Sequence, residues 1–260
     1  MLHYEISGNG KKPLVLLHGF MEDHTIWSDM ESHFSKEFTL IKIDLSGHGK
    51  SENNNAVNSM DFMAEKVKEV IEKLNLNKIN ILGHSMGGYV SLAFAEKFPE
   101  SIESLTLFFS TTLADDEEKK QIRRRSIAVI DENVETFVNT SIPNLFSNNE
   151  KDILEGKIEL AKKIAKSTNK EGVKAAQLGM AERPDRTEIL EKLEAKILII
   201  AGKYDNAVKT ENLLKALPDK TNIKTYVLDC GHCGHWEKPT ICAEIINTEL
   251  LHNLPKKLVF

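Results

Sequence analysis

Ser85, Asp205 and His232 have the side-chain types that nucleophilic catalysis needs. A serine hydroxyl is a weak nucleophile at neutral pH, so it needs a neighbouring base to take its proton as it attacks. A histidine can be that base, and a carboxylate beside it fixes the ring tautomer and stabilises the imidazolium that forms. Each of the three residues follows an apolar run that predicts a strand, and a parallel sheet presents its ligand crevice at that edge. We therefore expect the three side chains to meet at one sheet edge.

The serine lies in the segment Gly83-His84-Ser85-Met86-Gly87, between an apolar run at 79–82 and a helical pattern over 87–98. A serine at the tip of such a sharp turn is pushed toward strained backbone angles. Glycines two residues to either side remove the Cβ atoms that would clash there. The pattern predicts the strand–turn–helix of a nucleophile elbow. The alternative is a glycine-rich turn that carries an incidental serine.

Apolar runs and periodic patterns predict strands and helices in alternation along the chain. We expect strands over 2–7, 14–17, 38–45, 79–82, 102–109, 197–201 and 223–228, and helices over 60–74, 87–98, 210–217 and 240–251. The run at 197–201 is apolar throughout, which is typical of a strand buried on both faces. The alternation predicts an α/β fold, with a mostly parallel twisted sheet and helices on both faces.

The stretch 113–186 has a different character from the rest of the chain. Charged residues are dense in it, and its apolar residues recur at helical spacing, for example Ile127, Val129 and Ile130. This pattern predicts several amphipathic helices inserted between two strands of the sheet. We expect the cluster Arg123–Arg125 to be a solvated helix face, with an anion site as the alternative.

Four local sequences together resemble the α/β-hydrolase fold superfamily. They are His18-Gly19-Phe20 after a strand, the pentapeptide around Ser85, Gly202-x-x-Asp205 after a strand, and Gly231-His232 after the last strand. The chain looks most like the small soluble serine esterase-like members with a helical cap. The order Ser…Asp…His is the one found in that family. A loop with the pattern Asp44-x-x-Gly47-x-Gly49-x-Ser51 is also similar to a structural loop of the family.

The resemblance implies roles for residues and limits for domains. Ser85, Asp205 and His232 would form the catalytic triad, and the backbone N–H groups of Phe20 and Met86 would form the oxyanion hole. Residues 1–112 and 187–260 would form the hydrolase core, and residues 113–186 the cap. The cap would supply the substrate pocket, for which the apolar residues Ile142, Leu145, Phe146 and Met180 are candidates.

Several residues compete for these roles. His235 is an alternative base. The segment 231–239, however, resembles the family's Gly-His-x-x-x-x-Glu-x-Pro ending, in which the histidine after glycine, here His232, is the base. We therefore expect His235 to pack beside the site. Asp229 is an alternative acid, although three residues before His232 it is poorly placed to reach the imidazole. Cys230 and Cys233 have the Cys-x-x-Cys spacing of redox and zinc sites. A redox pair is expected early in a βαβ unit and not after the last strand, and a zinc site needs a second pair of ligands from another segment, which the sequence lacks. We expect no metal and no cofactor.

Composition excludes several classes of protein. The 260 residues carry 34 basic and 39 acidic side chains, a net charge of −5, which gives nucleic-acid binding no electrostatic support. There is no apolar run of 18 residues that would span a membrane. Three cysteines near the end of the sequence do not form a disulfide framework, and the first residues lack the order of a signal peptide. We expect a cytoplasmic monomer or homodimer that acts on a small molecule.

The leading interpretation is a serine hydrolase that cleaves a small carboxylic ester, or a related acyl substrate, through an acyl-enzyme. A second keeps the triad but changes the reaction, to that of a lyase, such as the menaquinone-pathway lyase that the chain also resembles, or of a C–C hydrolase. Arg123–Arg125 are the cationic cluster that could meet an acidic substrate of that kind. A third is a ligand-binding receptor on the same scaffold, because a fold alone does not fix the function.

Overall fold

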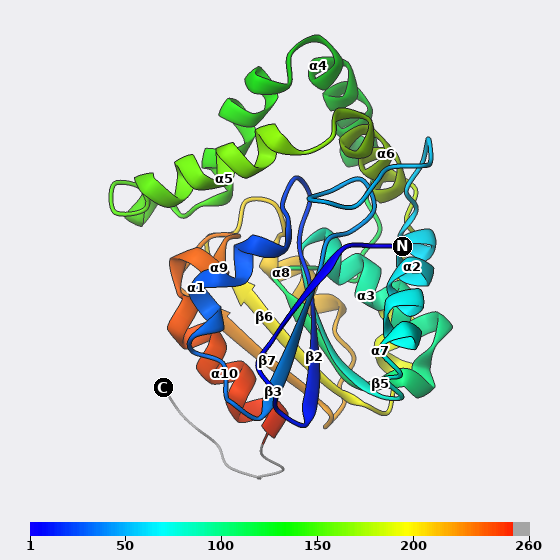
Figure 1. Ribbon diagram of the computed structural model, residues 1–260. Helices are drawn as coiled ribbons and strands as arrows, with labels where there is room; N and C mark the ends of the chain where they lie inside the picture. Colours follow the sequence, from blue (N-terminus) through cyan, green and yellow to red (C-terminus); the bar gives the residue numbers. More distant parts are fainter. Residues whose placement is uncertain (252–260) are drawn as a thin grey trace.

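A seven-stranded sheet forms the centre of the molecule, in the order β1-β3-β2-β4-β5-β6-β7 (Figure 1). The computed structural model describes residues 1–251, apart from the side chain of Glu150. The strands are β1 (Tyr4–Ser7), β2 (Lys12–Leu17), β3 (Phe38–Ile43), β4 (Ile79–His84), β5 (Ile102–Phe108), β6 (Lys196–Gly202) and β7 (Ile223–Leu228). β1 runs antiparallel to β3, and all other neighbours are parallel. The predicted mostly parallel sheet is confirmed.

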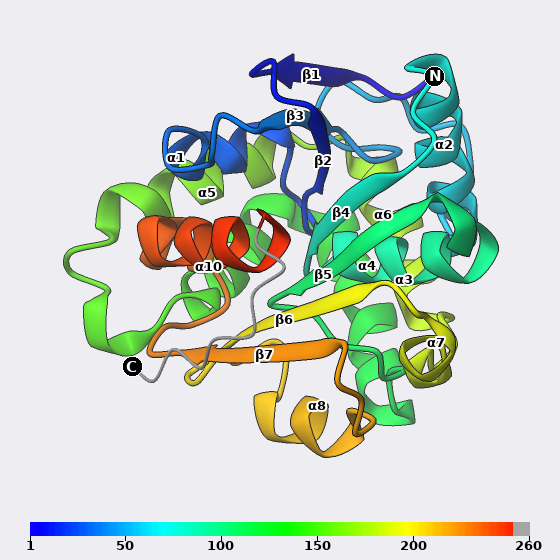
Figure 2. The same cartoon turned by 90° about the horizontal axis from the view of Figure 1, so that it is seen from below.

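Helices cover both faces of this sheet. The α-helices are α1 (Ser28–Glu31), α2 (Met60–Lys73), α3 (Met86–Lys97), α4 (Glu117–Ser141), α5 (Glu155–Ser167), α6 (Lys170–Ala181), α7 (Thr187–Lys192), α8 (Thr210–Ala216), α9 (Gly234–Glu237) and α10 (Pro239–Leu251). Short 3-10 helices are η1 (His24–Trp27), η2 (Pro99–Ser101), η3 (Ile142–Leu145) and η4 (Asn148–Glu150). α2, α3, α7 and α8 pack on one face, and α1 and α10 on the other (Figure 2).

The two faces of the sheet bury alternate residues of each strand. In β2, Val15 and Leu17 belong to one apolar cluster, while Leu14 and Leu16 belong to the other. Successive side chains of a strand point to opposite faces, so a strand buried on both sides reads as a continuous apolar run. This is why the short runs in the sequence located the central strands.

The helices of the insertion lie beyond the carboxyl ends of the strands (Figure 1). α4, α5 and α6 occur between β5 and β6 in the chain, and the long α4 is interrupted at Asn133, whose backbone leaves helical angles (φ −158°, ψ 98°). The Asn133 side chain accepts a hydrogen bond from the N–H of Thr136, as an N-cap does. The insertion is helical, as expected; the limits 113 and 186 of a separate cap remain a prediction.

Within residues 1–251, no helix combines the length and the apolar character that a membrane crossing needs.

Candidate active site

A cavity of about 490 Å³ lies at the carboxyl edge of the sheet, between the loops that follow the strands and residues of the helical insertion. Phe20, Ser85 and His232 line it, from the loops that follow β2, β4 and β7. Because these strands are parallel, their carboxyl ends share one edge, and residues far apart in the chain meet there. Asp205 follows β6 and contacts His232. The structure therefore places Ser85 and His232 at one cavity and Asp205 against His232. The cavity volume is in the range of small-molecule sites.

Ser85 lies in a strained turn between β4 and α3. Its backbone has φ 49° and ψ −113°, a region that non-glycine residues rarely adopt. A Cβ on Gly83 would overlap the carbonyl of Gly87, and one on Gly87 would overlap the carbonyl of Leu17. Both glycines are therefore required by close backbone packing. α3 begins at Met86, where the first N–H groups of a helix lack intrahelical partners and favour negative charge.

The Asp205 carboxylate holds the ring of His232. Its Oδ2 lies 2.7 Å from Nδ1 of His232, and its Oδ1 accepts the N–H groups of Ala207 and Val208, both at 2.8 Å. An ionised carboxylate only accepts, so Nδ1 carries the proton and Nε2 is left able to accept one. The rival acid Asp229 is a surface residue, paired with Lys203 at 3.0 Å.

His235 occupies a different environment from His232. It is fully buried among the rings of Trp27, Phe108 and Trp236, and neither of its ring nitrogens has a hydrogen-bond partner among the described residues. Burial, reinforced by the neighbouring His84, lowers its pKa well below the usual range. A neutral ring packed among aromatics agrees with the expectation that His235 packs beside the site.

The loop that carries His232 is fastened by Glu237, which the site predictions omitted although the Gly-His-x-x-x-x-Glu-x-Pro pattern contains it. One carboxylate oxygen accepts the N–H groups of Gly231 at 2.9 Å and Ser147 at 3.0 Å, and the other accepts that of Cys233 at 3.1 Å. Three backbone donors on one buried carboxylate fix the loop and join it to the insertion.

The backbone of Gly19, which precedes the predicted oxyanion donor Phe20, is held at both its C=O and its N–H. His18 Nδ1 donates to the Gly19 carbonyl at 2.7 Å, because its Nε2 accepts the N–H of Leu45 at 2.9 Å. The Gly19 N–H donates to Glu22 at 2.6 Å. In a trans peptide the C=O and the following N–H point in opposite directions, so the Phe20 N–H points away from His18. This arrangement gives the predicted oxyanion donor a fixed direction.

Glu22 and His84 form a buried pair in the wall of the cavity, which the sequence reasoning did not single out. His84 Nδ1 lies 2.8 Å from Glu22 Oε2, and its Nε2 lies 3.0 Å from the carbonyl of His232. Burial opposes ionisation of Glu22, but the charge and hydrogen bond of His84 outweigh it and lower the pKa of Glu22 to about 2. Burial also opposes the His84 cation, and Glu22 overcomes this and raises the pKa of His84.

The insertion supplies most of the predicted pocket residues. Ile142, Leu145 and Met180 line the cavity. Phe146 does not: it is fully buried and stacks on Trp236, with ring centroids 5.9 Å apart and planes inclined by 7°.

Arg123 also lines the cavity, which corrects the expectation that the whole arginine cluster is a solvated face. That expectation is right for Arg124 and Arg125, which are exposed. Arg123 instead hydrogen-bonds Asp115 through Nε and Gln177 through Nη1. Asp115 is fully buried and also pairs with Arg183 at 2.8 Å. Two guanidinium groups therefore share the Asp115 carboxylate. Asp116, Glu118 and Lys119 line the same wall, so charges of both signs face the cavity beside Arg123.

The cysteines are buried thiols, not exposed ligands. Cys230, Cys233 and Cys242 are unpaired with one another, and burial raises the pKa of each well above its usual range. A protonated thiol is a poor nucleophile and a poor metal ligand. This environment disfavours the redox and zinc interpretations of Cys230 and Cys233.

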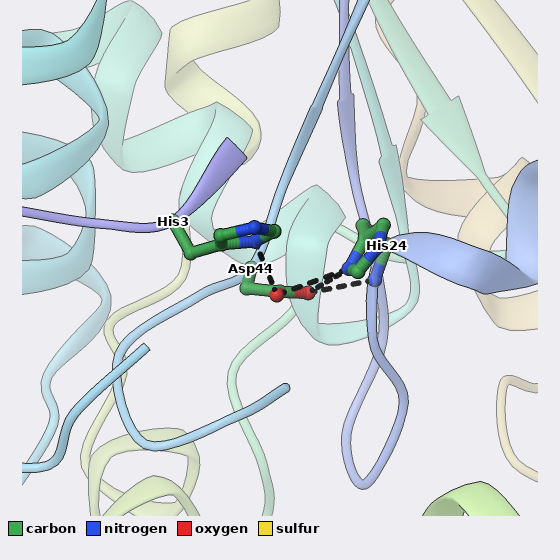
Figure 3. Close-up of side chains that lie close together, drawn as sticks. All are labelled: His3, His24 and Asp44. Carbon is green, nitrogen blue, oxygen red and sulfur yellow. Dashed lines mark hydrogen bonds and ion pairs between the residues drawn. The ribbon is translucent and has the colours of Figure 1, made fainter. Parts of the chain in front are cut away.

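A cluster of three potential metal ligands lies elsewhere, at the end of β3 (Figure 3). The Asp44 carboxylate accepts hydrogen bonds from the rings of His3 and His24 at 2.8 and 2.9 Å, and from the backbone N–H groups of His24 and Lys50. Ser51 Oγ donates to the Asp44 carbonyl at 2.7 Å. These contacts already engage both carboxylate oxygens and tie the first residues to the loop 44–51, as the structural role of that loop implies.

Comparison with known proteins places this geometry in context. A family model described as "alpha/beta hydrolase fold" matches residues 12–239. A 2-hydroxy-6-oxononadienedioate/2-hydroxy-6-oxononatrienedioate hydrolase of Escherichia coli K12 is 27% identical over 249 residues, covering 91% of this chain and 86% of the relative. A thermophilic esterase from Thermogutta terrifontis, with malate bound, superposes with a TM-score of 0.89 at 33% identity, over 96% of this chain and 93% of that one. MenH from S. aureus shares the fold, with a TM-score of 0.85 at 23% identity and coverages of 96% and 98%.

Proposed function

Because this chain belongs to the alpha/beta hydrolase fold family, we propose that it is a serine hydrolase that cleaves a small carboxylic ester or a related acyl substrate. The observation that carries the proposal is that His232, hydrogen-bonded to Asp205, lines the same cavity as Ser85. Serine, neutral imidazole and carboxylate in this relation are the groups that acyl transfer needs.

The reaction proceeds in two halves. Ser85 Oγ attacks the ester carbonyl while His232 Nε2 takes its proton, and Asp205 stabilises the imidazolium through Nδ1. The N–H groups of Phe20 and Met86 bind the oxyanion; each such donor contributes about 3–4 kcal/mol to transition-state binding. His232 then returns the proton to the leaving alcohol. In the second half, water loses a proton to His232 and attacks the acyl-enzyme. The bond from the acyl carbon to Ser85 Oγ then breaks, His232 returns the proton to Ser85 Oγ, and the acid is released.

A panel of p-nitrophenyl esters of increasing acyl length tests this proposal. We expect turnover of neutral short and medium esters, because apolar residues such as Phe20, Ile142 and Leu145 line much of the cavity. Long acyl chains should be poor substrates, since about 490 Å³ limits the length that can be enclosed. An absence of turnover, together with an absence of covalent labelling by a serine-directed phosphonate, would contradict the proposal. Labelling without any turnover would favour the receptor interpretation.

A second candidate is a C–C hydrolase or lyase-like reaction on a carboxylate-bearing substrate. The observation that favours it is Arg123, a guanidinium-bearing residue in the lining of the cavity. The E. coli relative is named for a dicarboxylate, and the Thermogutta esterase binds malate. A carboxylate on the substrate would form a charge-assisted hydrogen bond with the guanidinium.

Replacing Arg123 separates the two candidates. If the second candidate is right, Arg123→Met should raise KM for an ester that carries a carboxylate roughly 10-fold or more, because a hydrogen bond to a charged group contributes about 1.5–3 kcal/mol. If the first candidate is right, KM for this ester should change little. KM for the matching neutral ester should change little. Arg124→Met is the matched control, since Arg124 is exposed one residue away. Steady-state kinetics with both esters give the comparison. Strong wild-type preference for the anionic ester that disappears in Arg123→Met would favour the second candidate.

A further inference from the structure

We propose that Glu22 and His84 act as positioning residues. They align the loop after β2 that contains Gly19 and Phe20, which we call the oxyanion loop, with the loop after β7 that contains His232. The inference rests on the serine hydrolase function proposed above. Glu22 follows β2, His84 ends β4 and His232 follows β7, so the pair connects three strand ends of the active site.

The hydrogen bonds themselves fix the protonation of His84. Its Nδ1 faces a carboxylate oxygen of Glu22 at 2.8 Å, and its Nε2 faces the backbone carbonyl of His232 at 3.0 Å. A carboxylate and a carbonyl can only accept hydrogen bonds, so both ring nitrogens must donate. His84 is therefore an imidazolium, and the Glu22 carboxylate is its counter-ion in a site where an unpaired charge would be costly.

The Glu22 end of the pair holds the oxyanion loop. Oε2 of Glu22 accepts the N–H of Gly19 at 2.6 Å in addition to the proton of His84. The carbonyl of Gly19 is held by His18. With Gly19 held at both its N–H and its C=O, the next N–H, that of Phe20, has little freedom to turn away from a substrate oxyanion.

The His84 end of the pair holds the base. The carbonyl of His232 accepts from His84, and the N–H of His232 donates to the carbonyl of Leu145 at 2.7 Å. The backbone of His232 is thus fixed on both sides while Asp205 fixes its ring. Misplacement of a reacting group by about 1 Å can cost roughly 100-fold in rate, so these contacts have kinetic consequences.

A neutral glutamine cannot replace Glu22. If its amide oxygen takes the place of Oε2, it accepts from Gly19 and His84, but the imidazolium then has no counter-ion and loses a proton. If its amide nitrogen takes that place, it opposes the N–H of Gly19. The native pair makes three hydrogen bonds: Gly19 N–H to Glu22, His84 to Glu22, and His84 to the carbonyl of His232. Either arrangement of the glutamine breaks one of them, although the size of the side chain is unchanged.

The pair also predicts a change in the pH profile. The charged and titratable groups that interact with the pair come from several elements: His18, His48, Asp205, His232, Cys233 and His235. Glu22 raises the pKa of His84, so the wild-type imidazolium persists above its ordinary value of 6.5 and is lost as pH rises through the raised value. When His84 loses one of its two ring protons, it can no longer donate to both partners, so the hydrogen bond to the His232 carbonyl or the one to Glu22 is broken. Without Glu22 this loss occurs at lower pH, so the alkaline limb of kcat should move to lower pH.

The experiment measures kcat, KM and thermal unfolding against pH for the wild type, Glu22→Gln, His84→Gln and the double variant, with a neutral ester. We expect Glu22→Gln to lower kcat about 10- to 100-fold with KM nearly unchanged, and to move the alkaline limb to lower pH. The double variant should be no slower than the slower single variant, because the two residues act as one unit. Glu31→Gln is the control, because it removes another carboxylate paired with a cation, Lys42, far from the cavity.

A purely structural role would lower the unfolding temperature and leave the pH limb and kcat of the folded fraction unchanged. That result, or additive losses in the double variant, would overturn the inference. If Glu22→Gln does not fold, His84→Gln alone carries the test, with slower phosphonate labelling of Ser85 expected and wild-type labelling contradicting it. The proposed function fails separately, if Ser85→Ala keeps its activity.

Discussion

Ser85→Ala should abolish ester turnover, with kcat falling roughly 10⁴-fold or more, because members of a nucleophile–base–acid unit cannot act alone. The fold should be retained, because alanine keeps the same Cβ in the turn between β4 and α3 and leaves Gly83 and Gly87 in place. Ester kinetics and thermal unfolding of the same preparation measure the two effects.

Ser91→Ala is the matched control for this variant. Ser91 is a buried serine of α3, the helix that follows Ser85, and its hydroxyl donates back to the carbonyl of Gly87 at 2.8 Å, away from any reacting group. It should keep most of the turnover. Comparable losses in both variants would indicate that the helix tolerates no change, and would remove the case for Ser85 as the nucleophile.

His232→Ala should lose about as much turnover as Ser85→Ala, while His235→Ala should lose far less. The reason is that His232 hydrogen-bonds Asp205 and lines the cavity, whereas the ring of His235 has no hydrogen-bond partner among residues 1–251. His235→Ala should instead lower the unfolding temperature, since it leaves a void among Trp27, Phe108 and Trp236. Kinetics corrected for the folded fraction separate the two effects. The opposite ranking would assign the base to His235.

The fold could be predicted from the sequence because short segments mark its strands and helices. Apolar runs located the strands, since a sheet buried on both faces needs uninterrupted apolar residues. The boundaries moved by one to two residues at either end: β2 begins at Lys12 instead of Leu14, β3 ends at Ile43 instead of Leu45, and β4 extends to His84. Ladder pairing with a neighbouring strand decides such ends, and no single segment contains that information.

Residues of the candidate site could be predicted where a local sequence motif contains them. They could not be predicted where their position depends on contacts with residues far away in the chain. Ser85, Asp205 and His232 each follow a strand, and parallel pairing alone brings them to one edge. Glu22 has no motif; its role depends on His84, 62 residues away in the chain. The position of Arg123 likewise depends on Asp115 and Gln177. Phe146 was chosen for its apolar side chain, but it stacks on Trp236 because both are buried at the same interface.

Trapping the acyl-enzyme tests the central claim most directly. The wild-type protein is mixed with a p-nitrophenyl ester, quenched in acid during turnover, digested and analysed by mass spectrometry. We expect the acyl group on the peptide that contains Ser85, released with the rate of turnover and absent from Ser85→Ala. Turnover with no adduct on Ser85, or an adduct on another residue that persists in Ser85→Ala, would contradict a serine hydrolase mechanism at this site.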